Sequence, residues 1–155
     1  MIDRGKGYEV VVTPQRSDAD RVLNASISLA LDKLVRQGEF YPFGVALTRE
    51  GQIAVLTTQE TEARPTSDAF LGALRDSLSE GARSGSFTAA AIVADFSFEQ
   101  PRQTGEQDAI RVAVESAAGE AVTCFLPYTL VMPGGMRDVR PGQPFAQRGE
   151  RSIFT

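Results

Sequence analysis

The chain has 155 residues, of which 42% are hydrophobic and 23% are charged, and these proportions are typical of a single globular domain that buries its own core. It contains no histidine and one cysteine, Cys124, and so lacks the residues that supply most ligands in zinc, haem, iron–sulfur and blue copper sites. The absence of histidine also excludes the Ser-His-Asp and Cys-His nucleophile pairs. We therefore predict no metal and no cofactor, and a protein that binds rather than catalyses.

The formal net charge of −4 gives an acidic surface that would repel a phosphate backbone, so nucleic acid is disfavoured as a partner. The sequence has no apolar run of the roughly 18 residues that span a bilayer, and no signal-peptide pattern at its start, which predicts a cytoplasmic protein without a membrane partner. The excess of arginine over lysine, with much alanine and glycine, is typical of high-GC bacterial genes. Cys124 lies in an apolar run and is predicted to be a buried, inert thiol.

The first predicted element is a helix over residues 18–37, because apolar residues recur there at spacings of three and four. These residues are Leu23, Ile27, Leu31 and Leu34. Ser17 or Asp18 suits the start of this helix, and Gly38 suits its end. Before it, residues 8–13 carry three consecutive valines and suggest either a short strand or a poorly ordered arm.

Two hairpins are predicted from alternating apolar residues on either side of a three-residue loop that ends in glycine, as in a type I turn closed by a bulge. The loops are residues 49–51 and 117–119. The first loop places Leu47 opposite Ile53 and Val45 opposite Val55. The second places Val114 opposite Val122, Val112 opposite Cys124 and Ile110 opposite Leu126.

Between the hairpins, residues 66–83 predict a second helix, since Leu and Phe recur there at helical spacing. Residues 87–98 predict a long strand that is buried on both faces for part of its length, with a helix as the alternative. The polar residues 99–108 predict an exposed loop. After Tyr128, frequent proline and glycine predict about twenty residues without regular structure.

These elements predict an α+β fold in the order α-β-β-α-β-β-β, with about five antiparallel strands and both helices on one face of the sheet. Residues 1–128 are expected to form this single domain. Residues 129–155 are expected to form an irregular tail that packs on the domain or on a partner subunit.

The order of elements resembles the roadblock or profilin-like arrangement, a scaffold that commonly dimerises and acts as an adaptor. Two segments are also similar to segments of uncharacterised bacterial proteins. They are Phe40-Tyr41-Pro42-Phe43-Gly44, and Leu126-Pro127-Tyr128 after a strand that begins Asp108-Ala109-Ile110. Neither resemblance implies a catalytic residue.

Asp95 is the most prominent candidate site residue, because it lies in the apolar run of residues 92–96, where a buried carboxylate needs a partner or a raised pKa. There it would act as a general base or bind an arginine or lysine. The alternative is that it faces solvent at the end of its strand. Asp95 and Glu99 would form a carboxylate pair if the strand continued that far, but two carboxylates without further oxygen ligands do not predict a metal site.

Arg111 and Glu115 are predicted to lie on the outer face of one strand, either as a surface ion pair worth at most about 1 kcal/mol or at the rim of a ligand site. Tyr128 borders a proline at a strand end and is predicted to pack at the edge of the core. The leading hypothesis is a non-enzymatic interaction or adaptor module that associates with a second copy of itself or with another protein. The alternative is a small-molecule-binding domain or metal-independent enzyme that uses Asp95, Arg111 and Tyr128.

Overall fold

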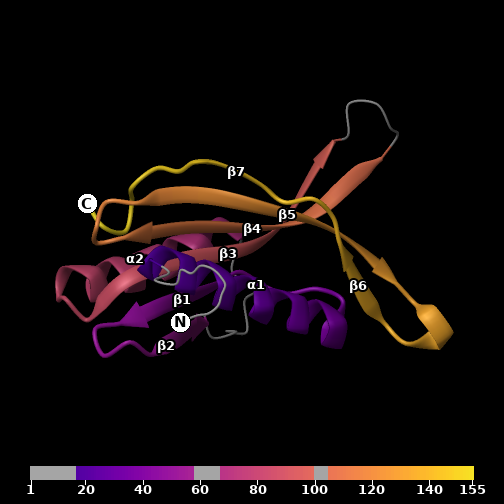
Figure 1. Ribbon diagram of the computed structural model, residues 1–155, viewed down its shortest axis with the longest axis horizontal. Coiled ribbons are helices and arrows are strands. Elements are labelled where there is room, and N and C mark those ends of the chain that lie inside the picture. Colours follow the sequence, from indigo (N-terminus) through magenta and orange to yellow (C-terminus); the bar gives the residue numbers. More distant parts are fainter. Residues whose placement is uncertain (1–16, 58–66, 100–104) are drawn as a thin grey trace, which may run out of the picture.

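The computed structural model in Figure 1 describes residues 17–57, 67–99 and 105–155 and contains two helices packed on an antiparallel sheet of seven strands. The helices are α1 (Asp18–Gln37) and α2 (Ser67–Arg83). The strands are β1 (Phe43–Thr48), β2 (Ile53–Thr57), β3 (Phe87–Glu99), β4 (Glu106–Ser116), β5 (Ala121–Val131), β6 (Asp138–Pro141) and β7 (Phe145–Arg148), with a 3₁₀ turn, η1 (Pro133–Gly135), between β5 and β6. The strand order is β2-β1-β3-β4-β5-β6, and β7 also pairs with β5. Within these ranges, neither helix is long and apolar enough to cross a membrane.

Helix α1 has the bounds that its sequence predicts. The Ser17 hydroxyl accepts a hydrogen bond from the Asp20 N–H at 3.1 Å, and Gly38, with a φ of 79°, donates its N–H to a carbonyl of the last turn. The most buried face consists of Val22, Ser26, Ala30 and Leu34, whereas the predicted Leu23, Ile27 and Leu31 are partly buried at its margins. Small side chains in the centre of this face allow the helix to pack closely on the sheet.

The two helices lie on opposite faces of the sheet, so the prediction that both cover one face is wrong. Successive residues of a strand point to opposite faces. In β3, Ala91 and Val93 belong to the core under α1, whereas Ala90 and Ile92 belong to a second core under α2. We call these two sides of the sheet the α1 face and the α2 face. The near-continuous apolarity of β3 follows from this arrangement, because the strand is covered on both sides.

Both hairpins have the predicted registers. Leu47 pairs with Ile53 in the β1–β2 hairpin, and Val112 pairs with Cys124 in the β4–β5 hairpin. The glycine that ends each loop has a positive φ, 88° at Gly51 and 107° at the second loop, which a residue with a side chain adopts at a cost.

The segments predicted to be irregular contain strands, and this raises the strand count above the expected five. β3 and β4 pair as far as Glu99 and Glu106, so only residues 100–105 separate them. Beyond Tyr128, β5 continues to Val131 and the chain returns along it as β6 and β7. Residues 8–13, for which a strand was weighed, lie outside the described residues, as do residues 100–104.

Pro127 does not end β5, because its missing N–H falls at a bulge. Its carbonyl accepts a hydrogen bond from the Gly142 N–H at 2.7 Å. The N–H and C=O of a strand residue point to the same side, so the proline nitrogen also faces the returning strand. Phe125 pairs with Phe145 and Tyr128 pairs with Pro141. Between these two pairs β5 has two residues, 126–127, whereas the returning strand has three, 142–144. A bulge of this kind tolerates proline within a sheet.

Beyond Pro127 the two long hairpins diverge, as the β3–β4 and β5–β6 ends in Figure 1 show. The β5–β6 end lies against α1, where Arg137 donates to the Arg36 carbonyl at 3.0 Å. The Gln107 side chain joins the diverging strands by donating to the Tyr128 carbonyl at 2.8 Å. The sheet therefore extends past both helices as a forked layer.

Candidate functional site

Strand pairing arranges the side chains of the α2 face in rows across β3, β4, β5 and β7. Starting under α2, the rows are Ala90–Glu115–Ala121, Ile92–Ala113–Thr123–Gln147, Ala94–Arg111–Phe125–Phe145, Phe96–Ala109–Pro127 and Phe98–Gln107. Ala90 and Ile92, from the first two rows, belong to the core under α2, and no residue of the later rows does. The later rows carry the candidate site.

In the first row, the buried Glu115 carboxylate holds residues 152–154 against the sheet. It accepts hydrogen bonds from the N–H groups of Ser152, Ile153 and Phe154 at 3.0–3.1 Å, and from the Ser152 hydroxyl at 3.2 Å. Arg151 closes this turn by donating to the Phe154 carbonyl at 2.8 Å. Successive N–H groups around one oxyanion form a nest, which favours a negatively charged acceptor. Through this contact Ile153 and Phe154 enter the core under α2.

The predicted surface ion pair between Arg111 and Glu115 is therefore wrong as far as Glu115 is concerned. Glu115 is only 4% exposed, and its carboxylate is occupied by the backbone of residues 152–154. Sequence alone hides this, because the partner lies more than thirty-five residues away along the chain.

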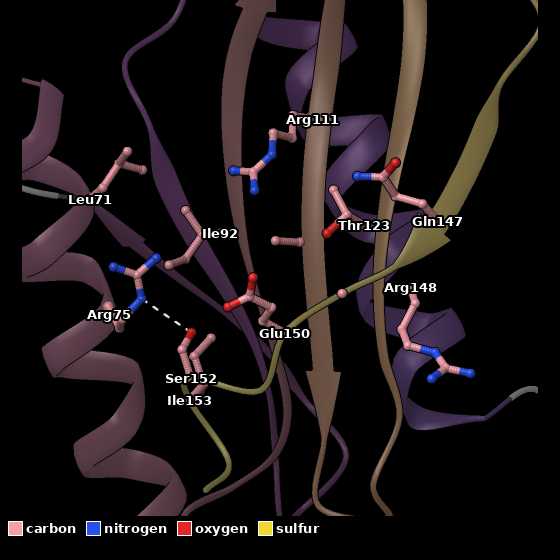
Figure 2. Close-up of a pocket in the computed structure, with 12 residues that line it drawn as sticks. Leu71, Arg75, Ile92, Arg111, Thr123, Gln147, Arg148, Glu150, Ser152 and Ile153 are labelled. Carbon is pink, nitrogen blue, oxygen red and sulfur yellow. Dashed lines mark hydrogen bonds between the residues drawn. The ribbon is translucent and has the colours of Figure 1, made fainter.

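A hollow of about 500 Å³, the Arg111 hollow, lies between α2 and the sheet. Figure 2 shows Arg75 and Arg111 pointing into it from α2 and β4, and Arg148 turned away from it. Arg75 donates from Nε to the Ser152 hydroxyl at 3.2 Å. Among the described residues, none hydrogen bonds to or forms an ion pair with the Arg111 guanidinium. The remaining polar lining consists of Thr123, Gln147 and Glu150.

A second hollow of about 520 Å³, the apolar hollow, lies on the other side of Arg111. Arg111 and Leu71 border both hollows. This one forms where β3 runs on past the start of β1, whose pairing with β3 begins at Phe43. Its other lining residues are Phe40, Tyr41, Pro42, Ala94, Asp95 and Phe96. Arg111 thus separates a polar space from a mainly apolar one.

Four phenylalanines cover the later rows of the α2 face, and we call them the aromatic cluster: Phe96, Phe98, Phe125 and Phe145. Phe125 and Phe145 are stacked with ring centroids 5.1 Å apart, and Phe96 lies 5.4 Å from Phe125. Phe96 is 40% exposed and Phe145 is 47% exposed. Ring pairs at these distances contribute about 0.5–1.5 kcal/mol each. Phe125 is buried beneath the other rings, whereas Phe96 and Phe145 keep much of their surface in contact with water.

The α1 face carries the other two predicted site residues, which contact each other. The hydroxyl of the buried Tyr128 donates to Asp95 Oδ1 at 2.7 Å. Desolvation raises the pKa of Asp95, the Tyr128 hydrogen bond acts in the opposite direction, and the charges of Asp108 and Glu39 add to the rise. The pKa of Tyr128 is raised by desolvation and by the same hydrogen bond. Tyr128 therefore stays protonated as a donor, and Asp95 is the acceptor.

The structure thus joins Asp95 to Tyr128 and places the Arg111 side chain on the opposite face of the sheet, although Asp95 and Arg111 both border the apolar hollow. Asp95 is exposed as a residue, at the end of the region that α1 covers. Sequence reasoning missed Arg75 and the aromatic cluster, and it placed Glu115 on the outer surface instead of in the buried contact with residues 152–154. The alternation of Phe96 and Phe98 was the available signal for the cluster.

Two further points concern sites. Cys124 is buried, as predicted, and desolvation raises the pKa of its thiol. In the part of the chain that the structure describes, no three acidic or cysteine side chains gather in a way that could hold a metal ion.

No family model, curated protein or solved structure matches this chain. The geometry alone therefore carries the argument about function.

Proposed function

We propose that this protein is an interaction module that associates with a second copy of itself through the aromatic cluster. The observation that carries the proposal is the exposure of Phe96 and Phe145, at 40% and 47%, within a contiguous set of rings that contact one another. Isolated exposed apolar residues are normal on protein surfaces, whereas a contiguous aromatic patch marks a site of association. Aromatic residues are also enriched in the contact regions of protein interfaces.

The layer beneath the cluster supports the same proposal. On the opposite face, Asp95, Ser97 and Asp108 are polar, and the Ser97 hydroxyl donates to Asp108 Oδ1 at 3.0 Å. This part of the sheet therefore has one polar face and one aromatic face. A sheet with one apolar face is stable when another layer covers that face. None of the described helices and strands supplies such a layer over Phe96 and Phe98.

A second copy is the occupant that the patch suits best. A two-fold contact brings the same surface patch of both copies together, so the patch must complement itself. Phenylalanine rings meet this condition because they stack on one another without a charged partner. Arg111 lies beside the aromatic cluster, in the same row as Phe125. We place Arg111 at the periphery of the dimer contact, so that the Arg111 guanidinium groups of the two copies stay apart.

The expected dimer is weak. With about 200 Å² of surface per aromatic side chain, the exposed fractions of Phe96 and Phe145 leave about 170 Å² of ring on each copy. Covering this surface on both copies contributes roughly 9 kcal/mol at about 25 cal/mol per Å². The loss of translational and rotational freedom costs about 4–15 kcal/mol. The net gain is then at most about 5 kcal/mol, so we expect reversible association with a Kd of roughly several hundred micromolar or weaker.

Sedimentation velocity over a series of protein concentrations tests the proposal. The wild type should pass from monomer to dimer as concentration rises, and the double variant Phe96→Ser/Phe145→Ser should weaken the dimer by about tenfold or more. The matched control is Ile53→Ser/Val55→Ser, which removes two apolar residues that are 40% and 46% exposed on β2. A wild type that stays monomeric at every concentration, or a dimer that only the β2 variant disrupts, contradicts the proposal.

A further inference from the structure

Arg111 is a half-buried residue whose guanidinium has no acceptor among the described residues. Its own strand places it between Ala109 and Ala113, and its neighbours across the sheet are Ala94 and Phe125. None of these side chains can accept a hydrogen bond. A guanidinium whose neighbouring side chains offer no acceptor is best satisfied by an oxyanion, which accepts two parallel hydrogen bonds.

The walls of the Arg111 hollow supply further donors. Arg75 uses Nε for its contact with Ser152, so its terminal nitrogens remain to face the hollow. Thr123 and Gln147 add a hydroxyl and an amide from β5 and β7. At about 500 Å³ the space is within the roughly 300–1,000 Å³ range of small-molecule sites. The donors exceed the acceptors, and such an excess suits an anionic ligand.

We propose that Arg111 anchors a binding site for small monocarboxylates with an apolar body, with the carboxylate in the Arg111 hollow and the body in the apolar hollow. Leu71 and Arg111 border both spaces, so one ligand can reach across them. Tyr41 and Phe96 offer ring surface to an aryl or alkyl group in the second space. This inference goes beyond the proposed self-association and does not rest on it.

Charge near the site sets the class of anion. Figure 2 shows the Glu150 carboxylate pointing into the Arg111 hollow, where it would repel a dianion more strongly than a monoanion. Asp95 borders the apolar hollow, but its carboxylate accepts from Tyr128 of the α1 face. The planar Arg111 guanidinium matches a planar carboxylate by a paired, fork-like contact. These features favour a monocarboxylate over a phosphate.

Titration followed by NMR tests this site, with phenylacetate and hexanoate as probes and phenylacetamide as the neutral analogue of the first. Protein concentrations are kept where sedimentation shows monomer, so that self-association does not enter the result. Phenylacetate should shift the Arg111 Nε–Hε resonance and the Phe96 ring resonances. Phenylacetamide should bind at least about tenfold more weakly, because it cannot form the charged pair.

A pair of variants separates this contact from general attraction. Arg111→Met keeps the aliphatic stem and should weaken phenylacetate binding by about tenfold or more. Arg148→Met removes the same charge from a side chain that borders the hollow but points away, and should change binding by less than about twofold. Equal losses in both variants, equal binding of phenylacetamide, or tighter binding of inorganic phosphate than of phenylacetate would overturn the proposal. The comparison of phenylacetate with phenylacetamide uses the wild type alone and therefore decides the question even if Arg111→Met fails to fold.

Discussion

Replacing Glu115 with glutamine should release residues 151–155 from the sheet while the remaining strands stay folded. The carboxylate accepts from three successive backbone N–H groups and one hydroxyl. Glutamine keeps one carbonyl oxygen and turns an NH₂ group toward donors that cannot accept from it. Hydrogen bonds to a charged group contribute about 1.5–3 kcal/mol each. The loss of roughly two of them destabilises the docked segment by about 3–5 kcal/mol.

Release should stay confined to residues 151–155, because the burial of their side chains does not exceed the backbone entropy that the segment gains on release. Ile153 and Phe154 are 2% and 7% exposed, and their burial stabilises the docked state by roughly 2 kcal/mol each. Release restores about 1–2 kcal/mol of backbone freedom for each residue. The hydrogen bonds to Glu115 therefore decide whether the segment stays docked. A loss of about 3 kcal/mol raises the population of the open form by more than about a hundredfold.

Hydrogen exchange of the backbone amides measures this change directly. In Glu115→Gln, the amides of Ser152, Ile153 and Phe154 should exchange at least about a hundredfold faster, while amides of β3 and β4 keep their rates. Glu106→Gln is the control, since it makes the same substitution at an exposed position of the same strand. Unchanged protection of residues 152–154, or equal acceleration throughout the sheet, would refute the reasoning.

Two other predictions concern the α1 face and α2. Tyr128→Phe removes the hydrogen bond that lowers the pKa of Asp95, so a ¹³C NMR titration should show that pKa rising further. Because the Asp95 pKa is raised on folding, the folded state loses stability as pH rises through it, and urea unfolding of Asp95→Asn should lack this part of the pH dependence. In α2, Gly72→Ala should stabilise the fold by about 0.5–1 kcal/mol, since a Cβ there meets nothing within 4 Å. Gly81→Ala should destabilise it by about 1–3 kcal/mol, since a Cβ would lie 2.2 Å from the Phe87 ring, and an opposite order in urea unfolding would contradict both assignments.

Local signals in the sequence predicted the parts of the fold that depend on neighbours along the chain. The caps of α1 and the glycines that end the two hairpin loops fixed those elements and their registers. The frequent proline and glycine after Tyr128 misled the prediction, because these residues ordinarily interrupt strands, and only pairing with distant parts of the chain shows where strands continue. For the same reason β6 and β7 were not visible, since their pairing with β5 follows a turn rich in glycine and proline.

The candidate site was predictable only in part, for a similar reason. Arg111 was recognised as facing outward, but its surroundings depend on α2 and on β7, which approach it from distant parts of the sequence. Asp95 and Tyr128 were recognised as residues at strand ends, and their contact with each other requires the register of three strands. Glu115 was misread because a charged residue near the end of a strand ordinarily lies in water.

The pattern of β3 ties these observations together. On the α1 face, the strand changes from apolar to polar after Val93, with Asp95 and Ser97, and this is where α1 ceases to cover it. On the α2 face the strand stays apolar, with Phe96 and Phe98, although those residues do not belong to the core under α2. Along the same stretch of β3, the α1 face is therefore polar and the α2 face is aromatic. Phe96 and Phe98 pack on Phe125 and Phe145 of the same copy, yet Phe96 stays 40% exposed. This remaining aromatic surface, which costs free energy in water, is what the proposed self-association would cover.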